Sequence, residues 1–404
     1  MVSVMWKTVS EDCNLACDYC YYSTCGGKPG PHIQRIDTQL LEKFMIEYMA
    51  ASRGVASFAW QGGEPLLAGL DFFQQVVSLQ AKHAPPHTII SNALQTNGTL
   101  INERWATFFK QYNFLLGVSL DGPREIHNLR RVDGAGLGSF DRVMKGIRYL
   151  EQQKVDFNIL TVIHKDNIHK VKELMEFYNQ EQFKYIQFIP CMDFRSQQVN
   201  SAGVYEVTPA EYGDFLCEVF DYWYNEGNPV ISIRFFDNLL SVYAHREAEL
   251  CSHRKLCPKT MILEHNGDAF PCDFYLHADW KLGNVATHSY EQLLASPVYD
   301  TFLSLKPQIP KPCKACEWQS LCHGGCPRNR AWLEYDNTVD VDYFCLSYKQ
   351  IYAYAHDRLR QLSDSIRADL YQNGITSAHK GKPPGRNDSC ACGSGRKYKN
   401  CCMN

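Results

Sequence analysis

The first half of the chain alternates between two hydrophobic periods, one typical of strands and one typical of helices. Short runs rich in apolar, β-branched or aromatic residues predict six strands, at 2–6, 57–60, 88–93, 114–120, 157–163 and 185–189. Between them, apolar residues spaced by three and four positions predict helices at 38–49, 70–82, 102–111, 140–152 and 168–178. Asp37 and Ser139 stand directly before two of these helices, where a side chain can cap the free backbone N–H groups.

Strands that alternate with helices are typical of parallel βαβ units. Residues 1–230 are therefore predicted to form an α/β fold, a partial (β/α)6 barrel of the TIM type. Such folds bind ligands at the carboxyl ends of their strands. Polar motifs follow these ends in turn: Cys13–Cys20, Gly62-Gly63-Glu64-Pro65, Gln95-Thr96-Asn97-Gly98, Ser119-Leu120-Asp121-Gly122, and Gln187 with Pro190-Cys191. A Gly-Gly or Asp-Gly pair alone indicates an ordinary turn, but motifs at the same end of successive strands predict one shared site.

Cysteine is the residue type that narrows the chemistry most. Of 18 cysteines, a triplet follows the first predicted strand, and it consists of Cys13, Cys17 and Cys20. Eight more form a second group: Cys251, Cys257, Cys272, Cys313, Cys316, Cys322, Cys326 and Cys345. A [4Fe–4S] cluster normally takes four Cys ligands, so a triplet leaves one iron open to another ligand. Eight cysteines suffice for two complete clusters.

Disulfides and zinc are the alternatives for these cysteines. Disulfides need an oxidising compartment, and residues 1–10 carry neither the basic start nor the apolar stretch of a secretory signal. We therefore expect a reducing cytoplasm. Zinc sites usually consist of two separated Cys pairs, which a tight triplet is not. At 313–326, where Cys-x2-Cys spacing occurs, zinc is a stronger alternative to an iron–sulfur cluster than a disulfide is.

The overall composition argues against two classes of partner. The chain has 404 residues and a net charge of −3, so its charge gives no general attraction to nucleic acid or to an anionic membrane. No apolar run reaches the length that a membrane-spanning helix needs. A chain of this length can form two or three domains.

The second half has a different character. A helix is predicted at 209–224, and a cysteine-rich domain with little helix signal follows at 231–350. Asn266-Gly267 within it is a strong hairpin signal. Bound metal explains how a region with so little regular structure folds. A helical stretch at 348–373 follows, and we take 351–378 as a separate C-terminal helix.

The last residues predict a small zinc module. A linker at 379–385 rich in Gly, Pro and Lys leads to residues 386–404. Four thiols stand within this segment, at Cys390, Cys392, Cys401 and Cys402. A module of this size has almost no core, so a closed tetrahedral zinc site is expected to fold it. The surrounding Lys and Arg residues indicate either an acidic partner or a solvated surface.

Taken together, these motifs resemble a known superfamily. Cys13-x3-Cys17-x-Tyr19-Cys20 followed by Gly62-Gly63-Glu64-Pro65 resembles the radical S-adenosylmethionine enzymes. The spacing from Cys257 through Cys272 to Cys345 is similar to their SPASM extension. Strings such as Trp60–Leu66 and Gly117–Pro123 are most similar to anaerobic sulfatase-maturating enzymes, over about residues 1–350. The tail from Gly385 to Cys402 resembles the SEC-C zinc motif, which is not standard in these maturases.

The resemblance implies an enzyme with several cofactors. S-adenosylmethionine would bind the open iron of the triplet cluster, and a radical derived from it would begin the oxidation of a Cys or Ser side chain in a sulfatase to formylglycine. The expected partners are a peptide or unfolded protein substrate and a flavodoxin- or ferredoxin-type reductant. Three [4Fe–4S] clusters and a Zn²⁺ ion are implied. One auxiliary cluster would be held by Cys251, Cys257, Cys272 and Cys326, and the other by Cys313, Cys316, Cys322 and Cys345.

The resemblance also implies roles for single residues. Asp273 matches the catalytic base, although a turn cap is the plainer alternative. Arg131 matches a contact to the methionyl carboxylate or ribose, with a solvated surface charge as its alternative. The other residues implied in cofactor or substrate binding are Tyr19, Tyr22, Gln61, Gly62, Gly63, Glu64, Gln95, Asn97, Ser119 and Asp121. Glu64 in particular is expected to meet the methionine ammonium.

Two other functions fit parts of the sequence. The first is a SPASM enzyme that builds thioether or carbon crosslinks in a ribosomally made peptide. Many of these carry an N-terminal leader-binding domain, whereas the triplet here begins at Cys13. The second is an iron–sulfur electron carrier or scaffold, which the open triplet disfavours because electron carriers close the cluster with four ligands. Cys25, Cys191 and Cys217 have no ligand role, and Cys217 is expected in a helix as a small core residue.

Overall fold

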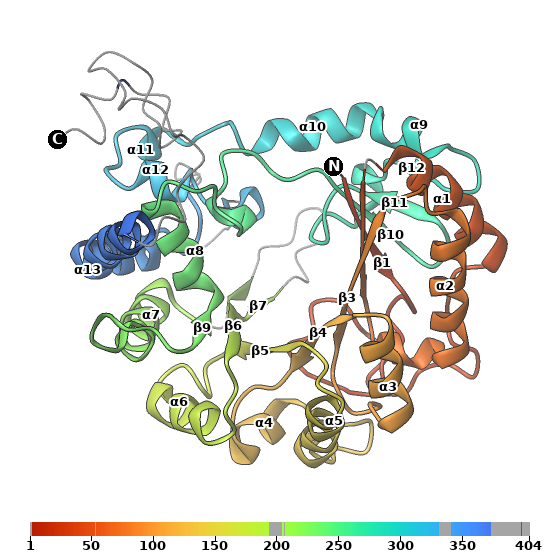
Figure 1. The fold of residues 1–404 in the computed structure, drawn as a ribbon, viewed down its shortest axis with the longest axis horizontal. Helices are drawn as coiled ribbons and strands as arrows, with labels where there is room; N and C mark the ends of the chain where they lie inside the picture. The colour runs from red at the N-terminus through yellow and green to blue at the C-terminus, as the bar shows by residue number, and fades with distance from the viewer. Residues whose placement is uncertain are drawn as a thin grey trace.

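The computed structural model describes residues 2–52, 54–193, 204–205, 207–330, 341–372 and 397. Within these ranges, ten strands form one sheet in the order β12-β11-β10-β1-β2-β3-β4-β5-β6-β9 (Figure 1). The six predicted strands are all present and pair in parallel: β1 Ser3–Lys7, β2 Val55–Gln61, β3 Ile89–Thr96, β4 Leu115–Ser119, β5 Phe157–Ile163 and β6 Tyr185–Pro190. The partial barrel predicted from the sequence is therefore confirmed.

Helices cover the outside of this curved sheet (Figure 1). They are α1 Thr38–Ala51, α2 Leu70–His83, α3 Glu103–Gln111, α4 Arg124–Arg130, α5 Phe140–Gln152 and α6 Val171–Gln180, and α4 is the one that the sequence analysis missed. Asp37 caps α1 as predicted, because its carboxylate accepts from the backbone N–H groups of Gln39 and Leu40. Ser139 was wrongly predicted as a side-chain cap. Its hydroxyl instead contacts His127 Nε2 at 2.9 Å and donates to the Arg131 carbonyl.

The strand period separates the core from the interior of the barrel. Because successive side chains of a strand point to opposite faces, Phe58 and Trp60 of β2 pack against the helices, whereas Ala59 and Gln61 line a central cavity. Trp6 of β1 stacks on Trp60 with ring centroids 6.1 Å apart. The aromatic layer thus lies on the helix side of the sheet, where Trp60 Nε1 donates to the buried Asn92 at 2.9 Å.

The second half of the chain extends the same sheet at both edges. β10, Thr260–Leu263, pairs in parallel with β1, and β9, Ser232–Ile233, pairs in parallel with β6. β11, Asp268–Phe270, and β12, Gly283–Asn284, follow β10 in antiparallel pairing. The predicted hairpin at Asn266-Gly267 joins β10 to β11, with Gly267 at a φ of +85°. The sheet thus continues across the boundary expected near residue 230.

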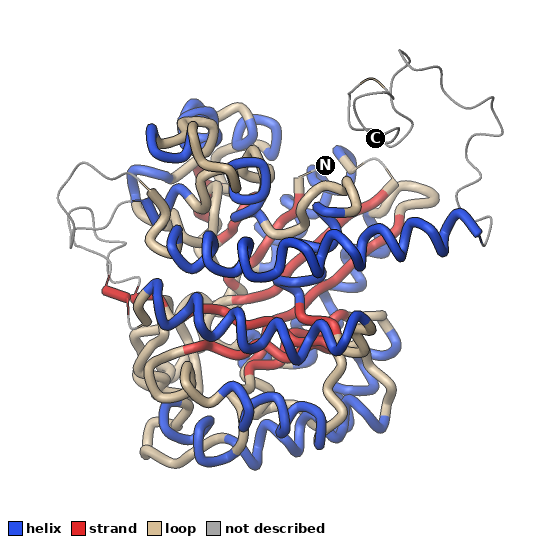
Figure 2. The backbone as a smooth tube through the Cα atoms, turned by 90° about the vertical axis from the view of Figure 1, so that its left-hand side faces the viewer, coloured by secondary structure: helices blue, strands red, loops and turns tan. Residues whose placement is uncertain are grey.

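Short helices and one long helix surround the cysteine-rich region. They are α7 Pro209–Tyr224, α8 Arg234–Tyr243, α9 Tyr290–Leu294, α10 Pro297–Leu305, α11 Lys311–Lys314, α12 Gln319–Cys322 and α13 Cys345–Gln372. The structure corrects the expectation of little helix here, since α8 follows β9 directly. It also places the start of the last helix at Cys345, before the predicted start at residue 348. Figures 1 and 2 show α13 alongside α7, and the Gln350 amide donates to Asp214 across this contact.

Two smaller features complete the described chain. β7, Met192–Asp193, pairs with β8, Val204–Tyr205, in a separate two-stranded sheet. None of the helices in the described ranges combines the length and the apolar content that crossing a bilayer requires.

Candidate active site

One cavity of about 970 Å³ lies inside the partial barrel, and its lining joins the carboxyl ends of the strands. The predicted residues that line it are Cys13, Cys17, Cys20, Tyr19, Tyr22, Gln61, Gly62, Gly63, Gln95, Asn97, Ser119, Arg131 and Asp273. The residues predicted to form one shared site are therefore close together. Glu64 and Asp121 do not line the cavity, and their positions are described below.

The cysteine triplet lies in the loop after β1. Burial raises the pKa of Cys17 to about 12, and the neighbouring Cys20 thiolate adds to this effect. Burial also raises the pKa of Cys13, and the carboxylate of Glu64 and the thiolates of Cys17 and Cys20 raise it further. Three thiolates this close together repel one another in the absence of a cation, and iron removes this penalty because a coordinating thiol is deprotonated. The donor set therefore fits an iron–sulfur cluster.

Cys25 is a fourth cysteine beside the triplet that has no predicted role. Its sulfur accepts from the Cys13 backbone N–H at 3.3 Å and donates to the Cys13 carbonyl at 3.2 Å. Ser23 contacts the same sulfur at 3.3 Å. Cys25 thus holds the backbone of the first predicted ligand, a role that spacing alone does not reveal.

The two glycines after β2 are required by close backbone contacts. A Cβ on Gly63 would lie 2.0 Å from the Asp12 carbonyl oxygen, and a Cβ on Gly62 would lie 2.8 Å from Cδ of Lys7. Both residues have positive φ, +91° at Gly62 and +50° at Gly63. The Glu64 N–H donates to the same Asp12 carbonyl at 2.8 Å. This loop therefore packs directly against the loop that carries the cysteine triplet.

Glu64 is a buried carboxylate that is held by three hydrogen bonds. Its side chain is fully buried and accepts hydrogen bonds from the Leu66 N–H at 3.0 Å, the Thr96 hydroxyl at 2.8 Å and the Asn97 N–H at 2.7 Å. Burial raises the pKa of Glu64 to about 7. The carboxylate joins the loops after β2 and β3. Its expected contact to the methionine ammonium stays a prediction.

Arg131 is a buried residue with a defined partner. Its guanidinium donates to the Asp121 carboxylate, through Nε at 2.8 Å and Nη2 at 3.2 Å, and lies 5.4 Å from the Tyr19 ring centroid. Burial opposes ionisation of Asp121, but the Arg131 charge outweighs it and holds the pKa of Asp121 below its usual value. Tyr19 donates to the same carboxylate. Asp121 thus positions two side chains that line the cavity, whereas its own carboxylate lies behind them.

Amide side chains complete the wall above β3 and β4. Gln95 Nε2 donates to the Ser119 hydroxyl at 3.1 Å. Asn97 Nδ2 lies 3.8 Å from the Cys13 sulfur and donates to Asn14 Oδ1 at 2.8 Å. These contacts connect the β3 end to the cysteine loop.

Asp273 lines the cavity from the segment that follows β11. Its carboxylate forms an ion pair with Lys7, accepts from the Tyr21 hydroxyl at 2.7 Å and lies 3.4 Å from Gln61 Nε2. These partners are side chains of β1, of the cysteine loop and of β2. The arrangement favours a site residue over a turn cap.

Lys7, Tyr21 and Glu264 belong to this site, although the sequence analysis did not select them. The Lys7 side chain is fully buried, and its ammonium lies 4.2 Å from the Tyr22 ring centroid. The Tyr22 hydroxyl donates to Glu264 at 2.8 Å. For Lys7, the sequence does contain a signal: a lysine is the last residue of an otherwise apolar strand, and a buried charge needs a partner.

The later cysteines separate into two groups in space. In the first, burial raises the pKa of Cys272, with the Cys326 and Cys251 thiolates as further causes, and Cys251 has the same effect on Cys257. Burial raises the pKa of Cys326 to about 12, and Cys251 raises it further. This group is the quartet Cys251, Cys257, Cys272 and Cys326, in agreement with the pairing that the resemblance implies.

The second group lies at the start of α13. Burial raises the pKa of Cys345 to about 11, and the thiolates of Cys313 and Cys316 add to it. Burial likewise raises the pKa of Cys322 to about 12, and Cys345 contributes. Among the described residues, no three His, Cys, Asp or Glu side chains converge closely enough for a single metal ion. Cysteines that bind the separate irons of a cubane cluster lie farther apart than the ligands of one ion. The ligand roles of both quartets stay predictions.

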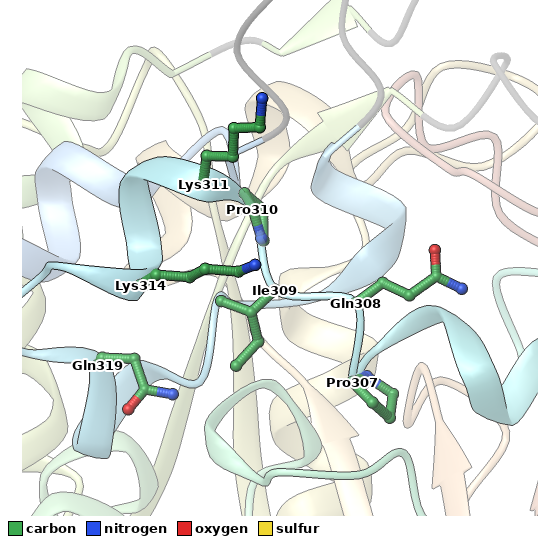
Figure 3. A pocket seen from close by; sticks show the side chains of 7 residues that line it. All are labelled: Pro307, Gln308, Ile309, Pro310, Lys311, Lys314 and Gln319. Atoms are coloured by element: carbon green, nitrogen blue, oxygen red, sulfur yellow. The ribbon is translucent and has the colours of Figure 1, made fainter.

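Two further regions lie outside the cavity. A separate hollow of about 670 Å³ is lined by Pro307, Gln308, Ile309, Pro310, Lys311, Lys314 and Gln319 (Figure 3). No predicted site residue borders it, so the barrel cavity is the better candidate for the active site. The predicted zinc ligands, Cys390, Cys392, Cys401 and Cys402, lie outside the described residues.

Comparison with known proteins defines the class. The radical SAM superfamily matches residues 8–178, the iron–sulfur cluster-binding SPASM domain matches 257–317, and the SEC-C motif matches 386–404. The protein is thus a radical SAM enzyme with a SPASM domain.

Relatives narrow this class further. A cysteine-type anaerobic sulfatase-maturating enzyme of Clostridium perfringens is 37% identical over 91% of this chain and 99% of its own length. A serine-type enzyme of Bacteroides thetaiotaomicron is 33% identical over 86% of this chain and 88% of its own. The chain belongs to the family of anaerobic sulfatase-maturating enzymes, as the resemblance predicted.

Comparison with solved structures agrees with this family assignment. Native anSMEcpe with bound AdoMet and a peptide is 37% identical, with a TM-score of 0.82 over 90% of this chain and 99% of that chain. SuiB of Streptococcus suis bound to its precursor peptide SuiA is 16% identical with a TM-score of 0.57, which shows a likeness of fold alone.

We predict that Gly63→Ala disrupts the cysteine loop. Its Cβ would overlap the Asp12 carbonyl, so the backbone must move, which typically costs about 1–3 kcal/mol beyond the ~1 kcal/mol of a left-handed alanine. The expected result is a lower melting temperature and less iron bound per chain. Gly136→Ala is the matched control, because Gly136 also has positive φ but has no atom within 4 Å of the place that a Cβ would take. Equal melting temperatures for the two variants would contradict the prediction.

Proposed function

We propose that this enzyme oxidises Cβ of a Cys or Ser side chain in a sulfatase segment to the aldehyde of formylglycine. The support is the family, together with one observation: Asp273 and the cysteine triplet line the same cavity. A carboxylate and a radical-generating site therefore face the same enclosed space, which a net two-electron oxidation of one side chain requires.

The residues that would hold the cofactors follow from this geometry. Cys13, Cys17 and Cys20 would bind a [4Fe–4S] cluster, whose open iron takes S-adenosylmethionine. Once bound, the cofactor supplies the radical that removes a hydrogen atom from the substrate Cβ. Arg131 would pair with the methionyl carboxylate. The remaining cavity residues proposed as contacts to S-adenosylmethionine are Tyr19, Gly62, Gly63, Gln95, Asn97 and Ser119.

Asp273 would act as the base of the reaction. Lys7 engages one carboxylate oxygen, and Tyr21 and Gln61 approach the other, so the group is held in a fixed orientation at the cavity. It would accept a proton from the substrate while one electron leaves, which completes the oxidation to an aldehyde for Ser or a thioaldehyde for Cys. Water then replaces the sulfur of a thioaldehyde and releases hydrogen sulfide.

The two later quartets would bind one [4Fe–4S] cluster each and carry the departing electron outward. A flavodoxin- or ferredoxin-type protein is the proposed reductant, and Zn²⁺ is the proposed metal of residues 386–404. We place the reaction in the reducing cytoplasm, since none of the 14 described cysteines forms a disulfide.

We expect the reconstituted enzyme to act on a peptide that contains Cys-x-Pro-x-Arg. Under anaerobic conditions with dithionite and S-adenosylmethionine, mass spectrometry should detect the peptide aldehyde and 5′-deoxyadenosine. Asp273→Asn should lower aldehyde formation by on the order of a hundredfold or more, since a general base contributes at least that much. Asp279→Asn, at an exposed carboxylate that does not line the cavity, is the control.

The other outcomes are equally informative. Deoxyadenosine without any change in the peptide would move the substrate to another class, such as a ribosomally made peptide. No deoxyadenosine from protein with full iron content would contradict the catalytic proposal.

A second prediction concerns Lys7. Lys7→Met removes the buried cation beside Asp273, so the carboxylate loses its partner and its fixed orientation. We expect aldehyde formation to fall at least about tenfold. A base that has lost its fixed orientation raises the activation free energy, and ~1.4 kcal/mol of activation free energy corresponds to a factor of ten in rate. S-adenosylmethionine cleavage should persist, so the ratio of deoxyadenosine to aldehyde rises. Lys172→Met, at an exposed helix position, should leave this ratio unchanged.

A further inference from the structure

Lys306 is a buried lysine that forms no ion pair with a carboxylate in the described part of the chain. It directly follows α10, and only 1% of its surface is exposed. The buried Asp342 is influenced by its charge, but that carboxylate accepts from the backbone N–H groups of Cys326 and Phe344 instead. Burial of an unpaired charge is costly, so a buried ammonium at this position indicates an anion of another kind.

The ammonium joins two loops that carry predicted cluster ligands. Its Nζ donates to the Ser252 carbonyl at 2.9 Å and to the Gly325 carbonyl. Ser252 directly follows Cys251, and Gly325 directly precedes Cys326. One side chain therefore holds together segments that are distant in the sequence.

Arg330 reinforces the same junction. Its Nε donates to the Gly324 carbonyl at 2.9 Å, and its Nη1 donates to the carbonyls of Leu305 at 3.1 Å and Gln308 at 3.0 Å. The backbone on both sides of Lys306 is thereby tied to the loop before Cys326. Since Lys306 is held in this way, its charge has a fixed position.

The first quartet lies beside this charge, because Nζ donates to the carbonyls of the residues next to Cys251 and Cys326. Burial lowers the pKa of Lys306, and the thiolates of Cys326, Cys257 and Cys251 oppose that effect. Cys322 of the second quartet is influenced by the same charge. The two carbonyl contacts nevertheless place the ammonium directly at two ligand loops of the first quartet.

We propose that Lys306 is a positioning residue for the cluster of Cys251, Cys257, Cys272 and Cys326: it ties two ligand loops together and places a fixed positive charge that raises the reduction potential of this cluster. The inference rests on the proposed function in that the quartet holds a [4Fe–4S] cluster. One electron converts such a cluster, with its four thiolates, from a dianion to a trianion. Net charge and hydrogen bonding set cluster potentials, and a nearby cation stabilises the more negative state.

The test is a potentiometric titration of the full-length holoenzyme with dithionite, followed by electron paramagnetic resonance. Addition of S-adenosylmethionine identifies the triplet cluster, because only its signal changes. We expect Lys306→Met to shift the midpoint of one auxiliary signal to a more negative potential and to shift the other less, since Cys322 of the second quartet is also influenced by this charge. Lys306→Arg keeps the charge and should retain a midpoint close to that of the wild type. Lys349→Met, at an exposed lysine beside the second quartet, is the matched control and should not move the signal that depends on Lys306.

Each outcome decides the matter. An unchanged midpoint in Lys306→Met at full iron content overturns the proposal, and so does an equal shift in Lys306→Arg, which would indicate packing instead of charge. If Lys306→Met loses iron, the result for Lys306→Arg decides between charge and packing. Retention of iron by Lys306→Arg shows that the positive charge is required and supports the proposal, whereas loss of iron in both variants overturns the proposal. The underlying cluster assignment is tested separately: if Cys272→Ala keeps the full iron content and both auxiliary signals of the wild type, the quartet holds no cluster.

Discussion

The parallel pairing of β10 with β1 holds the two halves of this chain together. A parallel sheet of six strands has two open edges, and unpaired strand edges must be covered. β10 and β9 cover them with strands from the cysteine-rich half. β11 runs back beside β10, and Asp273, three residues after β11, forms an ion pair with Lys7 of β1. The site is therefore complete only when both halves share one sheet.

Several cations are buried in the described residues, and three of them belong to the predicted sites. Lys7 pairs with Asp273, Arg131 pairs with Asp121, and Lys306 lies beside the first auxiliary quartet. Each is a charge that would be costly to bury alone. In each case the counter-charge comes from another segment of the chain. The charges thus stabilise the fold only when the predicted sites are assembled, which links folding to the chemistry.

Close backbone contacts also hold the loops around the cysteine triplet in place. Gly62 and Gly63 allow the loop after β2 to approach the cysteine loop, and Glu64 ties it to the end of β3. Cys25 holds the backbone of Cys13 from the other side. A cluster with one open iron needs ligands that do not shift when the cofactor binds, and such supporting contacts provide that rigidity.

The sequence by itself determined the strand–helix alternation, the six parallel strands, the cysteine groups and the motifs at the strand ends. These features are local, since they depend on hydrophobic period, turn chemistry and ligand spacing. Only the tertiary structure decided that Glu64 and Asp121 accept hydrogen bonds from side chains within the fold, that Ser139 bonds to His127, and that Lys7 meets Asp273. These outcomes depend on which side chains compete for each buried polar group. That competition involves residues far apart in the sequence, so no local pattern records it.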